Sequence, residues 1–250
     1  MPGYIEKLLQ RFLHPIPKKP KHQPHCHVQP QYITKVQLTQ PGDKTPLLKH
    51  ENINKLHQII GAVLYYARAV DGTLMTILNE LASTQSKGTQ ANMQAIKKLM
   101  DNCHTHSDTK IRYCAIQMKL YIHSNVSYLS ASKSRSRVEG HFFLSENFNP
   151  TSQTKHNGAV FVVAAILENV MASVPEALLG GLLINDKEGE VLITSLEEMG
   201  HPQGPTHMQT DNSMSSGIIN KTVKQHIFKA IDIRFYWVRD ICKQKHFLIY

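Results

Sequence analysis

Histidine and cysteine residues form two short clusters that could hold a metal ion. The first is residues 25–27 (His-Cys-His) and the second is residues 103–106 (Cys-His-Thr-His). A structural zinc site needs four ligands at characteristic spacings, and neither cluster has a partner cluster at such a spacing. The chain has four widely spaced cysteines and no Cys-x-x-Cys pair. We therefore expect reduced thiols and no zinc site.

Basic residues gather in a polar segment between two strand-like stretches, residues 119–123 and 138–144. Both stretches mix polar residues with aromatic and branched apolar ones, which predicts two neighbouring antiparallel strands. The connection between them carries Lys133, Arg135 and Arg137. These side chains could contact phosphate, whereas most basic turns are simply solvated. Both interpretations stay open at this point.

The composition is that of a globular protein with a basic surface. The chain has 250 residues, 41% of them apolar, and a formal net charge of +9. This length allows one or two domains. The charge favours polyanionic partners, although scattered lysines also mark an ordinary solvated surface. No apolar run approaches the roughly 18 residues that span a bilayer, and the N-terminus lacks the apolar centre of a signal peptide. We expect a soluble protein of the cytoplasm or nucleus.

The first hundred residues are expected to be helical around a linker. Apolar residues recur at three- and four-residue steps, which predicts helices over residues 4–13, 53–70, 73–84 and 89–103. Thr89 is the expected N-cap of the last of these helices. Residues 14–31 are rich in proline, lysine and histidine, and they predict an extended linker.

The rest of the chain alternates strand and helix patterns. Ser173 and Glu176 predict a capped helix start. Strands are expected over residues 158–167, 206–211 and 246–250, and helices over 174–183, 187–199, 212–220 (or a turn there) and 228–243. These elements predict an α/β fold.

Three stretches resemble copia-type retrotransposon polyproteins. Residues 123–129 (HSNVSYL) are similar to the first strand of the family's ribonuclease H domain, which reads close to HSDASYL. Residues 58–69 (QIIGAVLYYARA) resemble the helical connection between reverse transcriptase and ribonuclease H. Residues 1–7 (MPGYIEK) resemble the end of the polymerase part. The resemblance covers nearly the whole chain.

The resemblance implies a ribonuclease H-like mixed β-sheet with flanking helices, preceded by a helical segment and incomplete at its C-terminal end. The polymerase palm would lie upstream, so no reverse transcription is expected. The implied domains are the end of reverse transcriptase (1–13), a linker (14–50), the helical connection (51–106) and the incomplete ribonuclease H-like domain (107–250).

The resemblance also implies a chemistry and its metal ligands. Ribonucleases of this fold hydrolyse the RNA strand of RNA–DNA hybrids with two Mg²⁺ ions held by four carboxylates. The first acid position falls on Asn125 and the second on Leu178. The third falls on Asp211, which follows the expected fourth strand and is the only acid that is kept. The fourth belongs to a motif that would lie beyond Tyr250.

Two further acids do not replace the lost ligands, and two aromatic residues are candidates for base stacking. Glu176 precedes Leu178 by two residues, about 200° of helical rotation, so it points elsewhere and caps the helix. Asp232 matches a family stretch but no catalytic position, and we interpret it as structural. Tyr236 and Trp237 could stack on bases, but their spacing favours burial in the core.

One remaining acid cannot hold two Mg²⁺ ions, so Mg²⁺ is implied by the family but is not expected to bind functionally here. The leading hypothesis is a degenerate, truncated polyprotein fragment without ribonuclease activity. The alternative is a non-catalytic module that binds nucleic acid, RNA–DNA hybrid by the resemblance, through its basic surface, including Lys133, Arg135 and Arg137. A third possibility is a weakly active enzyme with ligands not yet identified.

Overall fold

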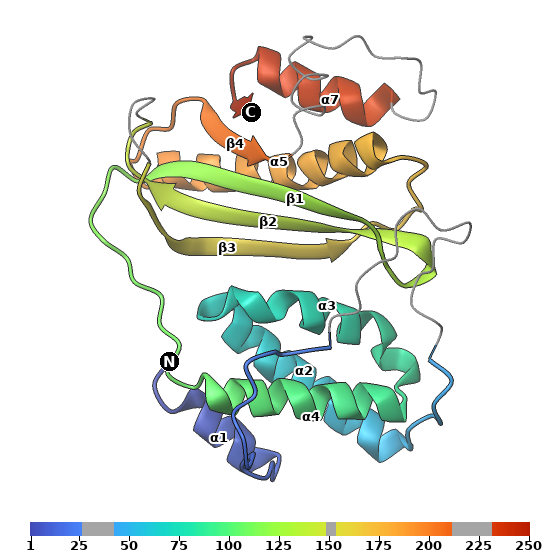
Figure 1. Cartoon of the computed structure of the whole chain (residues 1–250). Helices are drawn as coiled ribbons and strands as arrows, with labels where there is room; N and C mark the ends of the chain where they lie inside the picture. The colour runs from blue at the N-terminus through green and yellow to red at the C-terminus, as the bar shows by residue number, and fades with distance from the viewer. Residues whose placement is uncertain (27–42, 149–153, 212–231) are drawn as a thin grey trace. The chain divides into compact units, whose positions relative to one another are not determined.

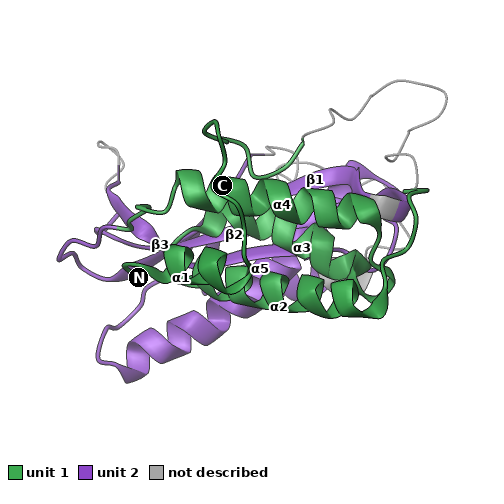
Figure 2. Cartoon of the chain, turned by 90° about the horizontal axis from the view of Figure 1, so that it is seen from below, with its two compact units in different colours: residues 1–111 green, residues 112–250 purple. Residues whose placement is uncertain are grey.

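The computed structural model describes residues 1–26, 43–148, 154–211 and 232–250. The chain divides into two compact units, Met1–Ile111 and Arg112–Tyr250 (Figure 2). The helix or turn predicted over 212–220 and part of the linker predicted over 14–31 lie outside the described residues. Within the described part of the chain, no helix is both long enough and apolar enough to cross a membrane.

The first unit is built from helices that bury the apolar faces predicted from the sequence. Its helices are α1 (Tyr4–Arg11), α2 (His50–Ala69), α3 (Met75–Thr84) and α4 (Gln90–Thr105), with short 3₁₀ turns η1 (Gly72–Leu74) and η2 (Gln85–Lys87). Leu56, Val63 and Leu99 are completely buried. The predicted cap of α4 is confirmed, because the Thr89 hydroxyl accepts a hydrogen bond from the Asn92 backbone amide.

The second unit contains a five-stranded mixed sheet, as predicted (Figure 1). Its strands are β1 (Lys119–Ala131), β2 (Arg135–Ser145), β3 (His156–Ile166), β4 (Thr206–Thr210) and β5 (Phe247–Ile249). The strand order is β3-β2-β1-β4-β5, with β1, β2 and β3 antiparallel and β4 and β5 parallel to β1. The two strands of the first hairpin are longer than expected, so only residues Ser132–Ser134 (η3) connect them.

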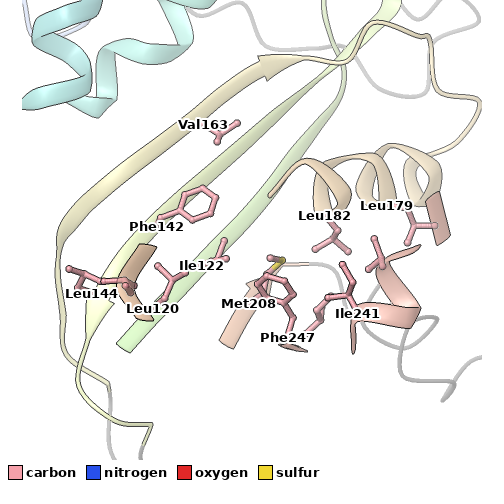
Figure 3. Packing of buried hydrophobic residues seen from close by; sticks show 13 residues of the cluster. Leu120, Ile122, Phe142, Leu144, Val163, Leu179, Leu182, Met208, Ile241 and Phe247 are labelled. Carbon is pink, nitrogen blue, oxygen red and sulfur yellow. The ribbon is translucent and has the colours of Figure 1, made fainter. Parts of the chain in front are cut away.

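Helices α5 (Val174–Glu198) and α7 (Asp232–Lys243) complete the second unit. Helix α5 packs against the β1–β2 hairpin, and α7 packs against α5 and β5. The buried side chains between these elements form the main core (Figure 3). That core contains Leu120, Ile122, Phe142, Leu144, Val163, Leu179, Leu182, Met208, Ile241 and Phe247.

The prediction of two helices over 174–183 and 187–199 is wrong, because α5 continues through both segments. Small residues let this long helix lie close to the sheet. A methyl group added at Gly189 would come 2.8 Å from the Ile122 side chain. The polar residues between the two predicted helices, Asn185 and Asp186, are completely buried instead of forming a loop.

A short segment at the start of the second unit runs beside the edge strand β3. The Gly158 amide donates to the Arg112 carbonyl oxygen at 3.4 Å. The Asn157 side chain accepts from the Cys114 amide at 2.9 Å and donates to the Cys114 carbonyl oxygen at 3.0 Å. These bonds cover the beginning of β3.

Candidate functional site

Asn125 and Asp211 come together where β4 ends beside β1. In the parallel register of β1 and β4, Ser124 lies opposite Thr210. The residues that follow them are Asn125 and Asp211. Neighbouring strands are about 4.8 Å apart. Both residues are exposed. Because ligands of α/β sheets bind at the carboxyl ends of parallel strands, this is the end of the sheet at which a site is expected.

The Asn125 side chain is already engaged locally. Its Oδ1 atom accepts a hydrogen bond from the Val126 backbone amide at 2.7 Å. An amide oxygen carries no net charge, whereas Mg²⁺ prefers anionic oxygen ligands in octahedral geometry. Asn125 is therefore a poor metal ligand both by its chemistry and by its hydrogen bonding.

Leu178 and Glu176 lie at the start of α5. Leu178 is buried, with 4% of its surface exposed. Glu176 accepts a hydrogen bond from the Ala172 amide at 2.7 Å, and the Ser173 hydroxyl accepts one from the Glu176 amide at 3.3 Å. The predicted capping of this helix start is confirmed. The position to which the resemblance assigns the second acid thus holds an apolar side chain inside the protein.

Glu139 is a neighbouring carboxylate that sequence reasoning missed. It lies directly opposite Asn125 in the β1–β2 register. Glu139, Asn125 and Asp211 therefore form a row across β2, β1 and the end of β4. Only the hairpin register could have pointed to Glu139, because it is 14 positions from Asn125 in sequence. Two acids flanking an amide do not match the four carboxylates of a two-metal centre. Among the described residues, no group of three His, Cys, Asp or Glu side chains could hold a metal ion.

The three predicted basic residues are not equivalent in the structure. Lys133 is exposed in the η3 turn, in a left-handed backbone conformation with φ of 61°. Arg135 and Arg137 belong to β2 and not to the turn. Arg137 is buried, with 6% of its surface exposed. The prediction that all three basic residues lie in one turn is therefore wrong, because β2 begins at Arg135 and includes both arginines.

The cysteines of the two histidine–cysteine clusters differ in solvent exposure. Cys26 is exposed, and its Sγ atom accepts a hydrogen bond from Lys98 Nζ at 3.1 Å. Cys103 is buried, and this burial raises the pKa of its thiol to about 12, which favours the neutral, unreactive form. His27 lies outside the described residues. His106 Nε2 lies 3.4 Å from His22 Nδ1, a contact that the sequence did not indicate.

The late aromatic residues differ in exposure. Trp237 is partly buried against the main core, as predicted, and Lys187 Nζ lies 6.0 Å from its ring centroid. The prediction that Tyr236 is buried is wrong, since 60% of its surface is exposed on α7. Asp232 begins α7, and its side chain lies outside the described part of the structure.

Aromatic and histidine rings occupy the sheet face opposite α5. Tyr121 stacks on His207 with ring centroids 5.1 Å apart, and His123 and His156 meet at 5.3 Å. Burial lowers the pKa of His123, with smaller contributions from His156 and His141. Burial also lowers the pKa of His156 and His207. These imidazoles are therefore neutral near pH 7, and sequence patterns alone did not reveal the cluster.

No protein-family model matches the chain, and no curated protein matches it significantly. Solved structures that resemble it include LC11-RNase H1, isolated from compost by a metagenomic approach, at 9% identity and a TM-score of 0.37, covering 53% of this chain and 83% of that chain. The N-terminal RNase H domain of a Mycobacterium tuberculosis protein has 9% identity and a TM-score of 0.36, covering 53% and 80%. A foamy viral protease-reverse transcriptase in complex with dsDNA has 13% identity and a TM-score of 0.32, covering 84% of this chain and 41% of that chain. Similarity at this level adds nothing about activity.

Proposed function

We propose that the chain is a ribonuclease H-like polypeptide derived from a copia-type retrotransposon polyprotein, and that it does not hydrolyse RNA–DNA hybrids. One observation carries the proposal. The three positions that the resemblance assigns to acids lie on β1, at the start of α5 and directly after β4, and they hold Asn125, Leu178 and Asp211.

Electrostatics support the proposed lack of activity. Two Mg²⁺ ions carry four positive charges, and the family balances them with four carboxylates. Asp211 supplies one negative charge. Leu178 cannot be turned into a ligand without cost, because a carboxylate placed at this buried position would lose its hydration. Among the described residues, the side chains at these positions do not fit a two-metal centre, which supports the proposal that the chain does not activate water for attack on a phosphodiester.

The test is cleavage of a fluorescently labelled RNA–DNA hybrid with Mg²⁺ or Mn²⁺. The wild-type chain, Asp211→Asn and Glu139→Gln are run side by side. We expect no cleavage by any of the three. Cleavage by the wild type that is lost in Asp211→Asn would overturn the proposal and show that a metal site is built around Asp211. Loss in Glu139→Gln as well would assign the carboxylate across β2 to that site.

A second candidate function is nucleic-acid binding without catalysis. It is favoured by the formal charge of +9. A nucleic-acid ligand and four cysteines without a disulfide fit a place in the cytoplasm or nucleus. A titration of binding against salt concentration separates this function from a remnant that binds nothing.

A further inference from the structure

The positive charge of the chain is concentrated in the helical unit. Residues 1–111 contain 14 lysines and arginines against 7 aspartates and glutamates, a formal net charge of +7. Residues 112–250 contain 14 against 12, a formal net charge of +2. The surface with the strongest attraction for a polyanion is therefore expected outside the unit that carries Asn125 and Asp211.

Residues 14–26, here called the strap, lie along α4. The Lys21 amide donates to Thr105 Oγ1 at 2.9 Å, and Asn102 Nδ2 donates to the Lys21 carbonyl oxygen at 2.8 Å. Lys98 Nζ also donates to Cys26 Sγ at the end of the strap. The segment predicted to be a linker is thus held to a helix about 80 positions away in sequence.

Prolines reduce the freedom of the strap further. Pro15, Pro17 and Pro20 each fix one backbone angle, so less conformational entropy is lost when the strap becomes ordered. A segment that is already ordered also loses less entropy when its side chains bind a ligand. The strap is therefore preorganised for binding and is more than a linker.

The strap presents cations with no competing acid of its own. It contains three lysines, three histidines and no aspartate or glutamate. Lys18, Lys19 and Lys21 are exposed, and so is Lys97 on α4. Asp101, the acid within α4, is bound by His14, with Nε2 and Oδ1 2.7 Å apart. The strap therefore supplies a hydrogen-bond partner for the acid of α4.

We propose, resting on the second candidate function given above, that the strap and α4 form a binding surface for the phosphodiester backbone of a nucleic acid. Three residues of extended chain span at most about 11 Å, which bounds the separation of Lys18 and Lys21 along the strap. All three lysines lie within this short span, so together they can face the phosphates of one stretch of a nucleic-acid strand. The strap has no phenylalanine, tyrosine or tryptophan to stack on bases. Binding is therefore independent of base sequence.

The test measures fluorescence anisotropy of a labelled 20-nucleotide oligothymidylate, and of a labelled duplex, with the full chain at 50 to 300 mM salt. The strap variant is Lys18→Gln with Lys19→Gln and Lys21→Gln. The matched control replaces three exposed lysines of the same unit outside the strap, Lys44, Lys55 and Lys87, by glutamine. Both variants remove the same charge from the same unit.

We expect the strap variant to bind at least tenfold more weakly at 50 mM salt. The slope of log affinity against log salt should become shallower by about 2 with the single strand, at roughly 0.7 per contact, and by about 3 with the duplex. The control should change the slope by less than about 1. Equal losses in both variants, or no binding by the wild type at 50 mM salt, would overturn the proposal.

Two further arms sharpen the test. Asn102→Ala with Thr105→Val keeps every lysine but removes the two side-chain bonds to Lys21, so affinity should fall while the salt slope stays. Far-UV circular dichroism checks that α4 is intact in this variant. Poly-glutamate that competes as well as the oligonucleotide would overturn the assignment to nucleic acid. The outcome is independent of the hybrid-cleavage assay, because no residue is shared between the two tests.

Discussion

A buried asparagine joins α5 to the strands beneath the row of Glu139, Asn125 and Asp211. Asn185 is completely buried, and its Nδ2 atom donates to Ser124 Oγ at 2.8 Å and to the Glu139 carbonyl oxygen at 3.2 Å. The side chain enters the space above Gly140. A methyl group added at Gly140 would lie 2.1 Å from Asn185 Oδ1, and its three nearest atoms all belong to that side chain.

These contacts predict a strong energetic coupling between Gly140 and Asn185. Gly140→Ala should lower the free energy of unfolding by about 1–3 kcal/mol, because the added methyl group forces the packed side chain to move. Asn185→Ala should lower it by about 2–4 kcal/mol, since the buried Ser124 hydroxyl and the Glu139 carbonyl both lose a donor. In the double variant the methyl group enters the vacated space. The double variant should therefore lose about 1–3 kcal/mol less than the sum of the single losses.

Urea unfolding followed by fluorescence of Trp237 measures this cycle. Trp237 is the single tryptophan and lies in the sheet unit, so it reports on the unit that contains both substitutions. Gly61→Ala is the matched control, because it lies on α2 in the helical unit and an added methyl group would meet nothing within 4 Å. It should leave the Trp237 transition unchanged. A coupling energy below about 0.5 kcal/mol would refute the packing argument.

Two predictions concern pH. Burial lowers the folded-state pKa of His123, His156 and His207 below the ordinary 6.5. The unfolded chain therefore binds protons at a higher pH than the folded chain does, and the free energy of unfolding should fall as pH drops through about 6.5. Urea midpoints measured between pH 8 and pH 5 check this, and a His123→Gln variant should show a shallower decline. Burial, with a smaller contribution from Glu190, raises the pKa of Asp186 well above 3.8, so its stabilising protonated form is lost as pH rises toward the folded-state pKa. Asp186→Asn should gain stability over the wild type as pH rises from 4 to 8, and an equal difference at both pH values would contradict this.

The strands and most helices could be predicted because they follow local patterns, whereas the mixed sheet was expected only from the family resemblance. The apolar period of α2 and α4 and the cap at Thr89 are properties of a few consecutive residues. The break predicted inside α5 failed for the opposite reason. Asn185 and Asp186 look like loop residues until the strands that bury them are known.

Contacts between distant segments explain the rest of what the sequence did not reveal. The strap looks like a free linker because its partner atoms on α4 are more than 80 positions away. Glu139 becomes part of the candidate site only through the hairpin register. Residue spacing alone did not assign Leu178 to the site either. The resemblance did, and the structure then gave its burial.

The partial cover of β3 has a consequence for handling the protein. Residues 112–114 bond only near its beginning, and in the described part of the chain no strand pairs with its outer edge. The uncovered stretch, residues 160–166 (VFVVAAI), is apolar, β-prone and uncharged. An edge of this kind is a template for pairing with another chain. Self-association at high concentration should therefore begin at β3. Replacing an outward-facing residue of this strand, such as Val160, by lysine should reduce it.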